Sequence, residues 1–399
     1  MAKQLYLIKT GEISLKGQNR SYFEKQLRHN IKDKLRPYHS ECVKQKGRLF
    51  FYIDEECPEE VIIKALSTTF GVVGYAHAIQ ADKKIESILE KAGKIITECN
   101  LPPHGTFKIA TRREDKSFPF SSYEVSCKAA EVVSAHYPQM GVNLTNPDFT
   151  LHIEIRHQVY LYTEAEKGPG GLPAGTAGRG LLLLSGGIDS PVAGVEMAKR
   201  GLKMDCLYFH AYPYTSEEAL EKVKKLASLI APYLNGTRLF VVPFTEQQLY
   251  LREKAYEDET TLMFRACMMQ TAERICAKYG QECIITGEAL SQVASQTLSA
   301  MSFTDSMSGK LVLRPLVGMD KEEIIKISKR IDTYETSILP YEDCCVIFSP
   351  KHPVTNPVKS VMKEHYASLE MDELLDKAVN ETYMFAYDAK GDEIIIKED

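Results

Sequence analysis

One stretch, Leu181–Ala193, constrains the fold of this chain more than any other. It opens with four leucines in a row, which predict a fully buried strand of a parallel sheet. The turn Ser185–Gly187 follows, then Asp189 and Ser190, which are good helix N-caps, and Pro191, which suits the first helical position. Because backbone N–H groups and the helix dipole converge after such a turn, the stretch predicts an anion-binding loop, with an ordinary strand-to-helix turn as the alternative.

The chain beyond this loop alternates predicted strands and helices, which is typical of a doubly wound parallel sheet. The predicted strands are Leu181–Leu184, Met204–Phe209, Thr237–Val242, Glu282–Thr286 and Leu311–Val317, and the predicted helices are Pro191–Arg200, Ser216–Ile230, Thr260–Tyr279 and Lys321–Lys329. Ligands of such sheets bind beyond the carboxyl ends of the strands. The residues at those ends are Leu183, Leu184, Tyr208, Phe209, His210, Thr286, Gly287, Glu288 and Arg314.

A length of 399 residues suggests two or three domains. Residues 1–75 and 76–165 each alternate short strands and helices, so we predict two small α+β domains, the first ferredoxin-like. Residues 166–180 are rich in glycine and predict a linker without stable helix or strand, and residues 181–399 form the α/β domain. Residues 1–50 hold 12 Lys and Arg against 4 Asp and Glu, although the chain carries −5 overall. This basic front favours a polyanionic partner, with a solvated basic surface as the alternative.

Two groups of cations are candidate contacts to a nucleic-acid backbone. They are Lys16 and Arg20 in one loop, and Arg112, Arg113 and Lys116 in another. The second group precedes Phe118 and Phe120, so phosphate contacts would lie beside rings on which bases stack. For both groups, an ordinary surface loop is the alternative interpretation.

The sequence predicts a cytosolic enzyme. No apolar run approaches the roughly eighteen residues that span a membrane, and the first ten residues lack a signal-peptide pattern. The ten cysteines form no CxxC pair, so in a reducing compartment most should be free and buried. This pattern argues against zinc or an iron–sulfur cluster, although distant cysteines could still meet in space.

Polar residues around the predicted loop suggest phosphate chemistry. Asp189 could hold Mg²⁺ on a bound triphosphate or act only as an N-cap. Ser185 and Ser190 can donate to phosphate oxygens. Arg265 lies in an otherwise apolar helix and needs a partner, either a phosphate or a structural carboxylate. A capping box at the start of the last predicted helix leaves Lys321 near the same edge of the sheet.

The segment Pro340–Pro350 contains adjacent cysteines, Cys344 and Cys345. Adjacent cysteines make a poor disulfide and a poor metal pair, because their side chains diverge. A nucleophilic or sulfur-carrying thiolate fits better, and two buried small apolar side chains are the alternative.

Several segments resemble known families. Ser185–Pro191 (SGGIDSP) resembles the PP-loop of ATP pyrophosphatases, which split ATP between its α- and β-phosphates. Phe107–Phe120 (FKIATRREDKSFPF) resembles the THUMP domain of RNA-modifying enzymes. Together with Gly168–Pro191, Gly287–Thr297 and Asp343–Pro350, they make nearly the whole chain similar to the tRNA 4-thiouridine synthetases (tRNA sulfurtransferases), in the form without a C-terminal rhodanese-like domain.

The resemblance implies a ferredoxin-like domain, a THUMP domain and a PP-loop domain of the adenine nucleotide α-hydrolase type. The implied ATP contacts are Leu183, Leu184, Tyr208, Phe209, Arg265, Gly287 and Gln296, beside the loop residues Ser185, Gly186, Gly187, Asp189 and Ser190. The family's reactive cysteine aligns best with Cys344, and Cys345 ranks second. Asp189 and Lys321 are further catalytic candidates.

The implied reaction is the ATP- and Mg²⁺-dependent thiolation of uridine at position 8 of tRNA. Uracil O4 attacks the α-phosphate, and persulfide sulfur then replaces AMP. tRNA and a cysteine desulfurase are the implied partners, and a homodimer is left open. Without the rhodanese-like domain, the family's second role in thiamine thiazole synthesis is in doubt. The alternatives are a PP-loop synthetase that adenylates a small molecule and a non-enzymatic tRNA-binding protein with a degenerate ATP site.

Overall fold

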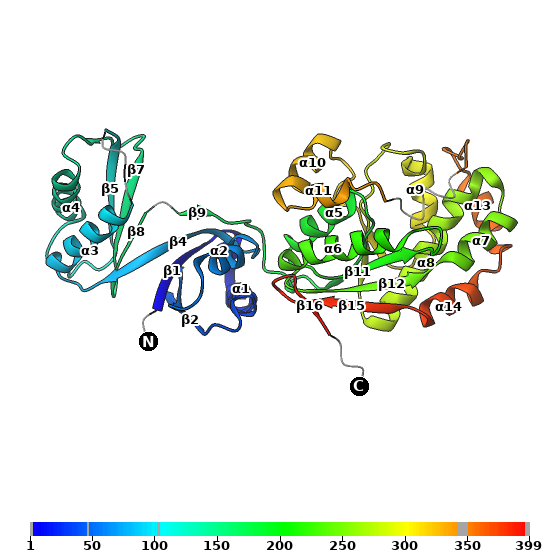
Figure 1. The fold of residues 1–399 in the computed structure, drawn as a ribbon, viewed down its shortest axis with the longest axis horizontal. Helices are drawn as coiled ribbons and strands as arrows, with labels where there is room; N and C mark the ends of the chain where they lie inside the picture. The colour runs from blue at the N-terminus through cyan, green and yellow to red at the C-terminus, as the bar shows by residue number, and fades with distance from the viewer. Residues whose placement is uncertain are drawn as a thin grey trace. The chain divides into compact units, whose positions relative to one another are not determined.

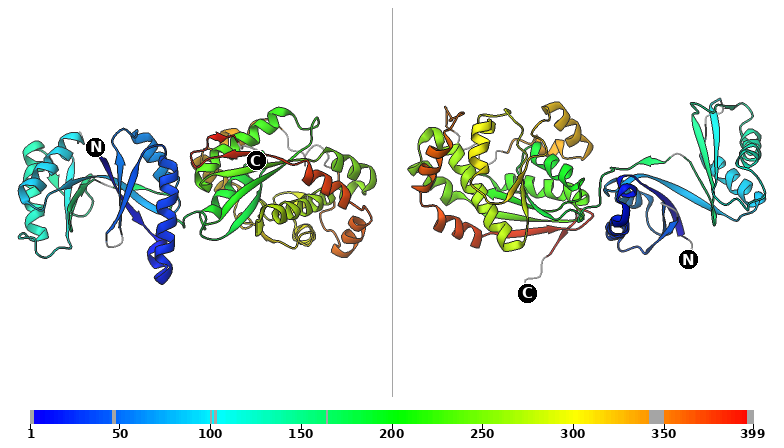
Figure 2. Two further views of the ribbon diagram at one scale, coloured as in Figure 1. Left: turned by 90° about the horizontal axis from the view of Figure 1, so that it is seen from below. Right: turned by 180° about the vertical axis from the view of Figure 1, so that it is seen from behind.

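The computed structural model describes residues 3–45, 48–99, 101, 104–163, 165–341 and 350–395. The chain divides into two compact units (Figures 1 and 2). Unit 1 comprises Met1–Arg20, Leu35–Ser67 and Gly71–Gly170, and unit 2 comprises Ser21–Lys34, Thr68–Phe70 and Gly171–Asp399. Helix α1 (Arg20–Leu35) therefore belongs almost wholly to unit 2. Within the described ranges, no helix has the length and apolar character needed to cross a membrane.

Unit 1 is built on a sheet with the strand order β2-β3-β1-β4-β8-β7-β5-β6, and β9 also pairs with β4. The strands are β1 (Lys3–Thr10), β2 (Ser40–Gln45), β3 (Arg48–Asp54), β4 (Val72–Ala81), β5 (Thr106–Arg113), β6 (Gly141–Val142), β7 (Phe149–Ile155), β8 (Val159–Tyr162) and β9 (Glu166–Lys167). The helices of this unit are α2 (Glu59–Ser67), α3 (Ile85–Glu98) and α4 (Ser122–His136), with the short 3-10 turns η1 (Glu12–Leu15) and η2 (Gly17–Asn19) after β1.

Strand β4 runs through both predicted small domains. Its first part pairs with β1, as in Leu7↔Ala76, and its last part pairs with β8, as in Ile79↔Leu161. The predicted boundary between residues 75 and 76 lies inside this strand, so the two α+β parts share one sheet. The sequence did not predict β4, because its glycine and alanines have low strand propensity.

Unit 2 holds the predicted doubly wound sheet, with the strand order β14-β13-β10-β11-β12-β15-β16. The parallel strands are β10 (Arg179–Leu183), β11 (Lys203–His210), β12 (Thr237–Pro243), β13 (Cys283–Ile285) and β14 (Leu311–Leu313), and the antiparallel edge consists of β15 (Tyr383–Tyr387) and β16 (Glu393–Ile394). The chain proceeds from β10 to β11 and β12 on one side, then returns to β13 and β14 on the other. The strand order therefore reverses beside β10, and such a switch point is where open α/β sheets bind ligands.

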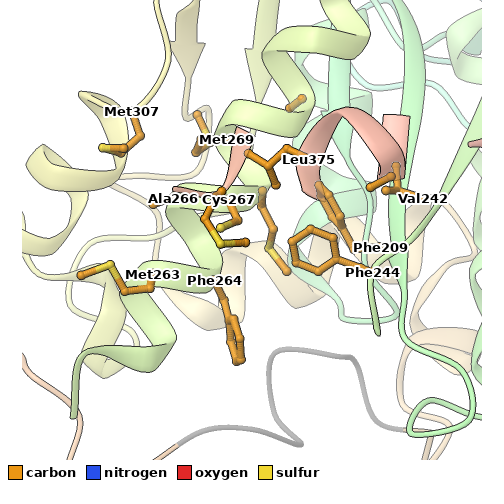
Figure 3. Close-up of a cluster of buried hydrophobic side chains, with 14 of the residues drawn as sticks. Phe209, Val242, Phe244, Met263, Phe264, Ala266, Cys267, Met269, Met307 and Leu375 are labelled. Carbon is orange, nitrogen blue, oxygen red and sulfur yellow. The ribbon is translucent and has the colours of Figure 1, made fainter. Parts of the chain in front are cut away.

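Helices cover both faces of this sheet (Figure 1). They are α5 (Asp189–Ala198), α6 (Glu217–Leu234), α7 (Thr245–Lys254), α8 (Thr260–Tyr279), α9 (Leu298–Asp305), α10 (Lys321–Arg330), α11 (Tyr334–Ser337), α13 (Lys359–Ala367) and α14 (Asp372–Asn380), with the 3-10 turns η3 (Glu257–Glu259) and η4 (Ala294–Gln296). Leu182 packs into the core shared with α5, α6 and α10, and its neighbour Leu181 packs into the core shared with α8, α13 and α14. In the second core, the rings of Phe209 and Phe244 meet edge to face at 4.8 Å (Figure 3). Four successive leucines thus serve two cores, as a strand buried on both faces requires.

Several predicted boundaries need correction. Helix α5 begins at Asp189, with Ile188 as a cap that makes no side-chain bond, so the predicted capping by Asp189 or Ser190 is wrong. Strand β14 ends at Leu313 rather than Val317, since Pro315 has no N–H for the ladder. The sequence also missed α7, α9, β15 and β16.

Two other predictions concern the linker and the cysteines. Within the predicted linker, the N–H groups of Gly175, Thr176 and Ala177 all donate to the Gly201 carbonyl oxygen at 2.9–3.0 Å. These bonds attach this part of the linker to the loop before β11, so it is an ordered part of unit 2. The eight cysteines in the described part of the chain are free thiols, and five of them are buried, as predicted.

Candidate nucleotide-binding site

A cavity of about 260 Å³ opens at the switch point, beyond the carboxyl ends of the parallel strands in unit 2. Ten of the predicted ATP contacts line it, namely Leu183, Leu184, Ser185, Asp189, Ser190, Tyr208, Phe209, Arg265, Gly287 and Gln296. Met268, Met269, Thr286, Glu288 and Thr304 complete the lining. Gly186 and Gly187 stand in the loop between these walls. Residues from the ends of three strands, β10, β11 and β13, therefore meet residues of α5, α8, α9 and η4 at one place.

The loop after β10 is held in shape by its own serines. The Ser185 N–H donates to Ser190 Oγ at 2.9 Å, and Ser190 Oγ lies 3.3 Å from the Ser185 carbonyl oxygen, to which it donates. The Gly187 N–H donates to Ser185 Oγ at 3.3 Å. The single hydroxyl proton of Ser190 is thus used within the loop, which favours a shaping role for this residue. The loop turns toward the first N–H groups of α5, which form the expected anion-binding end.

Gly287 follows β13 and touches the start of helix α5. A Cβ atom at this position would lie 2.7 Å from the Ser190 backbone nitrogen and 2.9 Å from the Asp189 carbonyl carbon. The sequence predicted that Gly287 lets a ligand approach the backbone. The structure adds a second reason for glycine, because the helix N-terminus itself occupies the space that a side chain would need.

Asp189 is engaged on both carboxylate oxygens. Lys321 Nζ bonds Oδ1 at 2.5 Å, and Gln292 Nε2 donates to Oδ2 at 2.9 Å. Lys321 opens α10, whose predicted capping box between Asp320 and Glu323 is confirmed. The sequence missed Gln292, since an amide in a polar loop carries no recognisable signal before folding brings it to Asp189.

Arg265 makes the structural ion pair that the sequence left as an alternative, and it also lines the cavity. Its guanidinium pairs with the buried carboxylate of Glu288, which also accepts from Arg314 Nε at 2.8 Å and Thr286 Oγ1 at 2.9 Å. Burial alone would raise the pKa of Glu288, but the two guanidinium groups outweigh it and hold the pKa below its ordinary value.

In this cluster Arg314 also donates to Asp305 Oδ1 at 2.9 Å, so Glu288 is the carboxylate that Arg265 shares with Arg314. The Arg265 Nε atom is buried and has no hydrogen-bond partner among the described residues. An anionic ligand in the cavity would meet the guanidinium of Arg265, which lines it.

The predicted nucleic-acid contacts all lie in unit 1. Arg112 and Lys116 are exposed, and Lys16 pairs with Glu12 at 3.0 Å. Arg20 begins helix α1.

In the loop of the second cation group, Arg113 and Phe118 differ from the prediction. The guanidinium of Arg113 donates to the carbonyl oxygens of Phe118 and Phe120, at 3.1 and 2.9 Å. Phe118 is a core residue with 3% exposure. It was expected to be a stacking surface, and that expectation is wrong, because the turn folds its ring inward.

Cys344 and Cys345 lie outside the described residues. The chain just before them is fastened by Lys222 of α6, a buried lysine whose ammonium donates to the carbonyl oxygens of Leu339 at 2.8 Å and Tyr341 at 3.4 Å. The chain after them is fastened near η4, where Thr297 Oγ1 donates to the Thr355 carbonyl oxygen at 2.6 Å. Sequence reasoning missed both anchors, since their partners lie far away in the chain.

Comparison with known proteins identifies the family. A relative from Clostridium kluyveri, named "Probable tRNA sulfurtransferase", is 43% identical over 382 residues, which cover 95% of this chain and 98% of the relative. A protein of the same name from Caldanaerobacter subterraneus is 44% identical over 375 residues, with 94% and 97% coverage. The chain belongs to the tRNA sulfurtransferase family. The resemblance predicted from the motifs is confirmed.

Family matches cover the three parts of this sulfurtransferase. Residues 5–76 match the ThiI ferredoxin-like domain, residues 82–164 match the THUMP domain, and residues 175–371 match the family described as "Thiamine biosynthesis protein (ThiI)". A solved 4-thiouridine synthetase, described as an RNA complex with bound ATP, superposes with a TM-score of 0.89 at 33% identity. The superposition covers 96% of this chain and 99% of the other, and it confirms the predicted fold class.

Proposed function

We propose that this sulfurtransferase converts a uridine of tRNA to 4-thiouridine, at position 8, using ATP. The observation that carries the proposal is the cavity at the switch point, where ten predicted ATP contacts converge. The similarity over nearly the whole length to a 4-thiouridine synthetase with ATP and RNA supports the choice of substrate.

The first step is adenylation of the base. Uracil O4 forms a bond to the α-phosphorus of ATP, and the bond to the bridging oxygen breaks, so pyrophosphate leaves with its electron pair. The N-terminus of α5 faces the phosphates, and Arg265 and Lys321 supply positive charge where negative charge develops. Phe209, Met268 and Met269 form an apolar wall that suits an adenine ring.

Magnesium is a further part of the proposal. Mg²⁺ usually keeps several waters and takes one or two carboxylates beside the phosphates, so the single carboxylate of Asp189 fits such a site. In the structure that carboxylate is bonded to Lys321 and Gln292. Asp189 would therefore exchange the Lys321 bond for the metal, which leaves the ammonium for a phosphate oxygen. When bound, Mg²⁺ would neutralise phosphate charge and orient the triphosphate.

The second step delivers sulfur. A persulfide on Cys344, with Cys345 as the second candidate, forms a bond from its outer sulfur to uracil C4. AMP leaves with the former O4, and cleavage of the S–S bond releases the 4-thiouridine. That cleavage needs a second thiol or another reductant, for which Cys345 is a candidate. A cysteine desulfurase is the proposed persulfide donor. The free thiols of the described cysteines fit the reducing cytoplasm as the place of reaction.

Mass spectrometry of tRNA nucleosides, after incubation with ATP, magnesium and a persulfide source, tests the proposal. The wild-type chain should form 4-thiouridine, and tRNA should be required for release of pyrophosphate from ATP. Asp189→Ala should lower both pyrophosphate release and thiolation, whereas Cys344→Ser should release pyrophosphate without thiolation. Cys345→Ser tests the second candidate, and Cys99→Ser, in unit 1, is the matched control. Adenylation that proceeds equally well without tRNA would favour a small-molecule synthetase and overturn the proposal.

A further inference from the structure

The loop between β11 and α6 exposes two tyrosines beside the nucleotide cavity. Tyr208 and Phe209 of β11 line that cavity, and the strand ends one residue later at His210. Tyr212 and Tyr214 follow, with 59% and 44% of their surface exposed. Exposed aromatic side chains gathered in one short loop are typical of a binding surface.

The loop holds these tyrosines in a fixed place. At its base, the Ala211 N–H donates to Thr215 Oγ1 at 2.9 Å, and the Thr215 N–H donates back to the Ala211 carbonyl oxygen at 2.9 Å. Thr245 Oγ1, at the start of α7, donates to the Tyr212 carbonyl oxygen at 2.7 Å. A surface that is already ordered loses little conformational entropy when it binds a ligand.

A row of rings connects the loop to the cavity. The ring of Tyr208, which lines the cavity, stacks with the ring of His210 at a centroid distance of 5.9 Å. The His210 ring in turn lies 6.3 Å from the ring of Tyr212. Alternate residues of a strand point to the same face of the sheet, so Tyr208 and His210 of β11 lie on one face, and Tyr212 follows two residues after the strand ends. Tyr212 therefore lies two ring contacts away from the cavity wall.

The charge around the loop selects the chemistry of its partner. Residues 211–215 contain no cation, and Glu217 and Glu218 follow directly in the first turn of α6. Carboxylates repel a phosphate backbone, so the loop offers ring faces and no phosphate contact. A flat, uncharged face is what an unpaired nucleobase stacks on.

The reaction supplies such bases. A base must leave its stack before an enzyme can act on its ring atoms, and its neighbours then lose a stacking partner. We propose that Tyr212 and Tyr214 form a stacking platform for the unpaired tRNA bases that flank the acceptor uridine. This inference rests on the proposed function and adds to it a place on the enzyme for those bases.

The test uses the full chain, tRNA, ATP, magnesium and a small-molecule persulfide as sulfur donor, so that no donor protein takes part. The double variant Tyr212→Leu, Tyr214→Leu removes the rings and keeps apolar bulk. Its kcat/KM for tRNA thiolation should fall about 5- to 150-fold, while its affinity for ATP stays unchanged. The double variant Tyr212→Phe, Tyr214→Phe should retain activity. Tyr383→Leu, a similarly exposed tyrosine (42%) on β15, is the matched control.

Stacking itself can be measured with tRNA that carries 2-aminopurine next to the acceptor uridine, because stacking quenches its fluorescence. The wild-type enzyme should quench the probe, and the leucine double variant should restore its emission. Unchanged thiolation and unchanged quenching in that variant would overturn the proposal. Loss of activity in the phenylalanine variant, or a defect seen only with a protein sulfur donor, would do the same. A wild-type chain that quenches the probe but forms no 4-thiouridine would refute the proposed function and leave the platform standing.

Discussion

Gly287→Ala is the sharpest test of how unit 2 builds its nucleotide site. The added Cβ would stand 2.7 Å from the Ser190 nitrogen and 2.9 Å from two further backbone atoms of Asp189 and Ser190. An ordinary contact needs about 3.4 Å, so β13 and α5 must separate by about 0.7 Å. Backbone atoms cannot rotate away as a flexible side chain can. Overpacking of this kind destabilises a protein by about 1–3 kcal/mol.

The same displacement moves the phosphate-facing end of α5. Misplacement of reacting groups by about 1 Å can lower a rate about 100-fold. We therefore expect Gly287→Ala to reduce kcat/KM for tRNA thiolation by about 10- to 100-fold and to weaken ATP binding. The loss of stability corresponds to a fall in Tm of about 2–12 °C, so kinetics are measured well below the variant's Tm.

Gly318→Ala is the matched control. A Cβ atom at this position would have no neighbouring atom within 4 Å, and the backbone φ of Gly318 is not in the left-handed region, so both rate and Tm should stay close to wild type. A Gly287→Ala enzyme with wild-type ATP affinity and wild-type kcat/KM would refute the reasoning, since it would mean that the start of α5 is free to move without consequence.

Three further predictions concern other parts of the molecule. Arg112→Ala should weaken tRNA binding and reduce its salt dependence by about one phosphate contact, whereas Arg113→Ala should lower Tm by loosening its own turn. Glu288→Gln should cost about 3–5 kcal/mol of unfolding free energy, because the largely buried guanidinium of Arg265 loses its counter-charge and that of Arg314 keeps only the exposed carboxylate of Asp305. Lys222→Met should lower thiolation with sulfur from a persulfide while pyrophosphate release continues, and Lys225→Met on the same helix should change neither.

The variants of Glu288, Arg113 and Lys222 each have an outcome that would contradict the role assigned to the residue. Folding lowers the pKa of Glu288. The contribution of this carboxylate to the free energy of unfolding is therefore present above its pKa in the unfolded chain, and it is lost as the pH falls through its pKa in the folded protein. The glutamine variant should lack that part of the acid slope in thermal unfolding, and an unchanged slope contradicts the assignment. An Arg113→Ala chain with unaltered Tm but weaker tRNA binding would restore the phosphate role. Equal loss of pyrophosphate release and thiolation in Lys222→Met would point to a general folding role.

The sequence by itself determined the chemistry of the site and the class of fold. Leu181–Leu183 fall in strand β10, whose side chains pack into cores on both faces of the sheet, and the loop that follows lies where the strand order reverses. The predicted ATP contacts meet in one cavity because parallel strands align their carboxyl ends. Such features depend on residues close together in the chain, which is why they can be read before folding.

Only the tertiary structure decided which side chains meet across long separations. Gln292 reaches Asp189, Glu288 joins Arg265 to Arg314, and Lys222 holds the chain before the two cysteines. Strand β4 shows the same limit, because its weak local propensity is overridden by neighbours on both sides. Pairings of this kind depend on distance in space and on burial, and neither quantity is written in the spacing of residues along the chain.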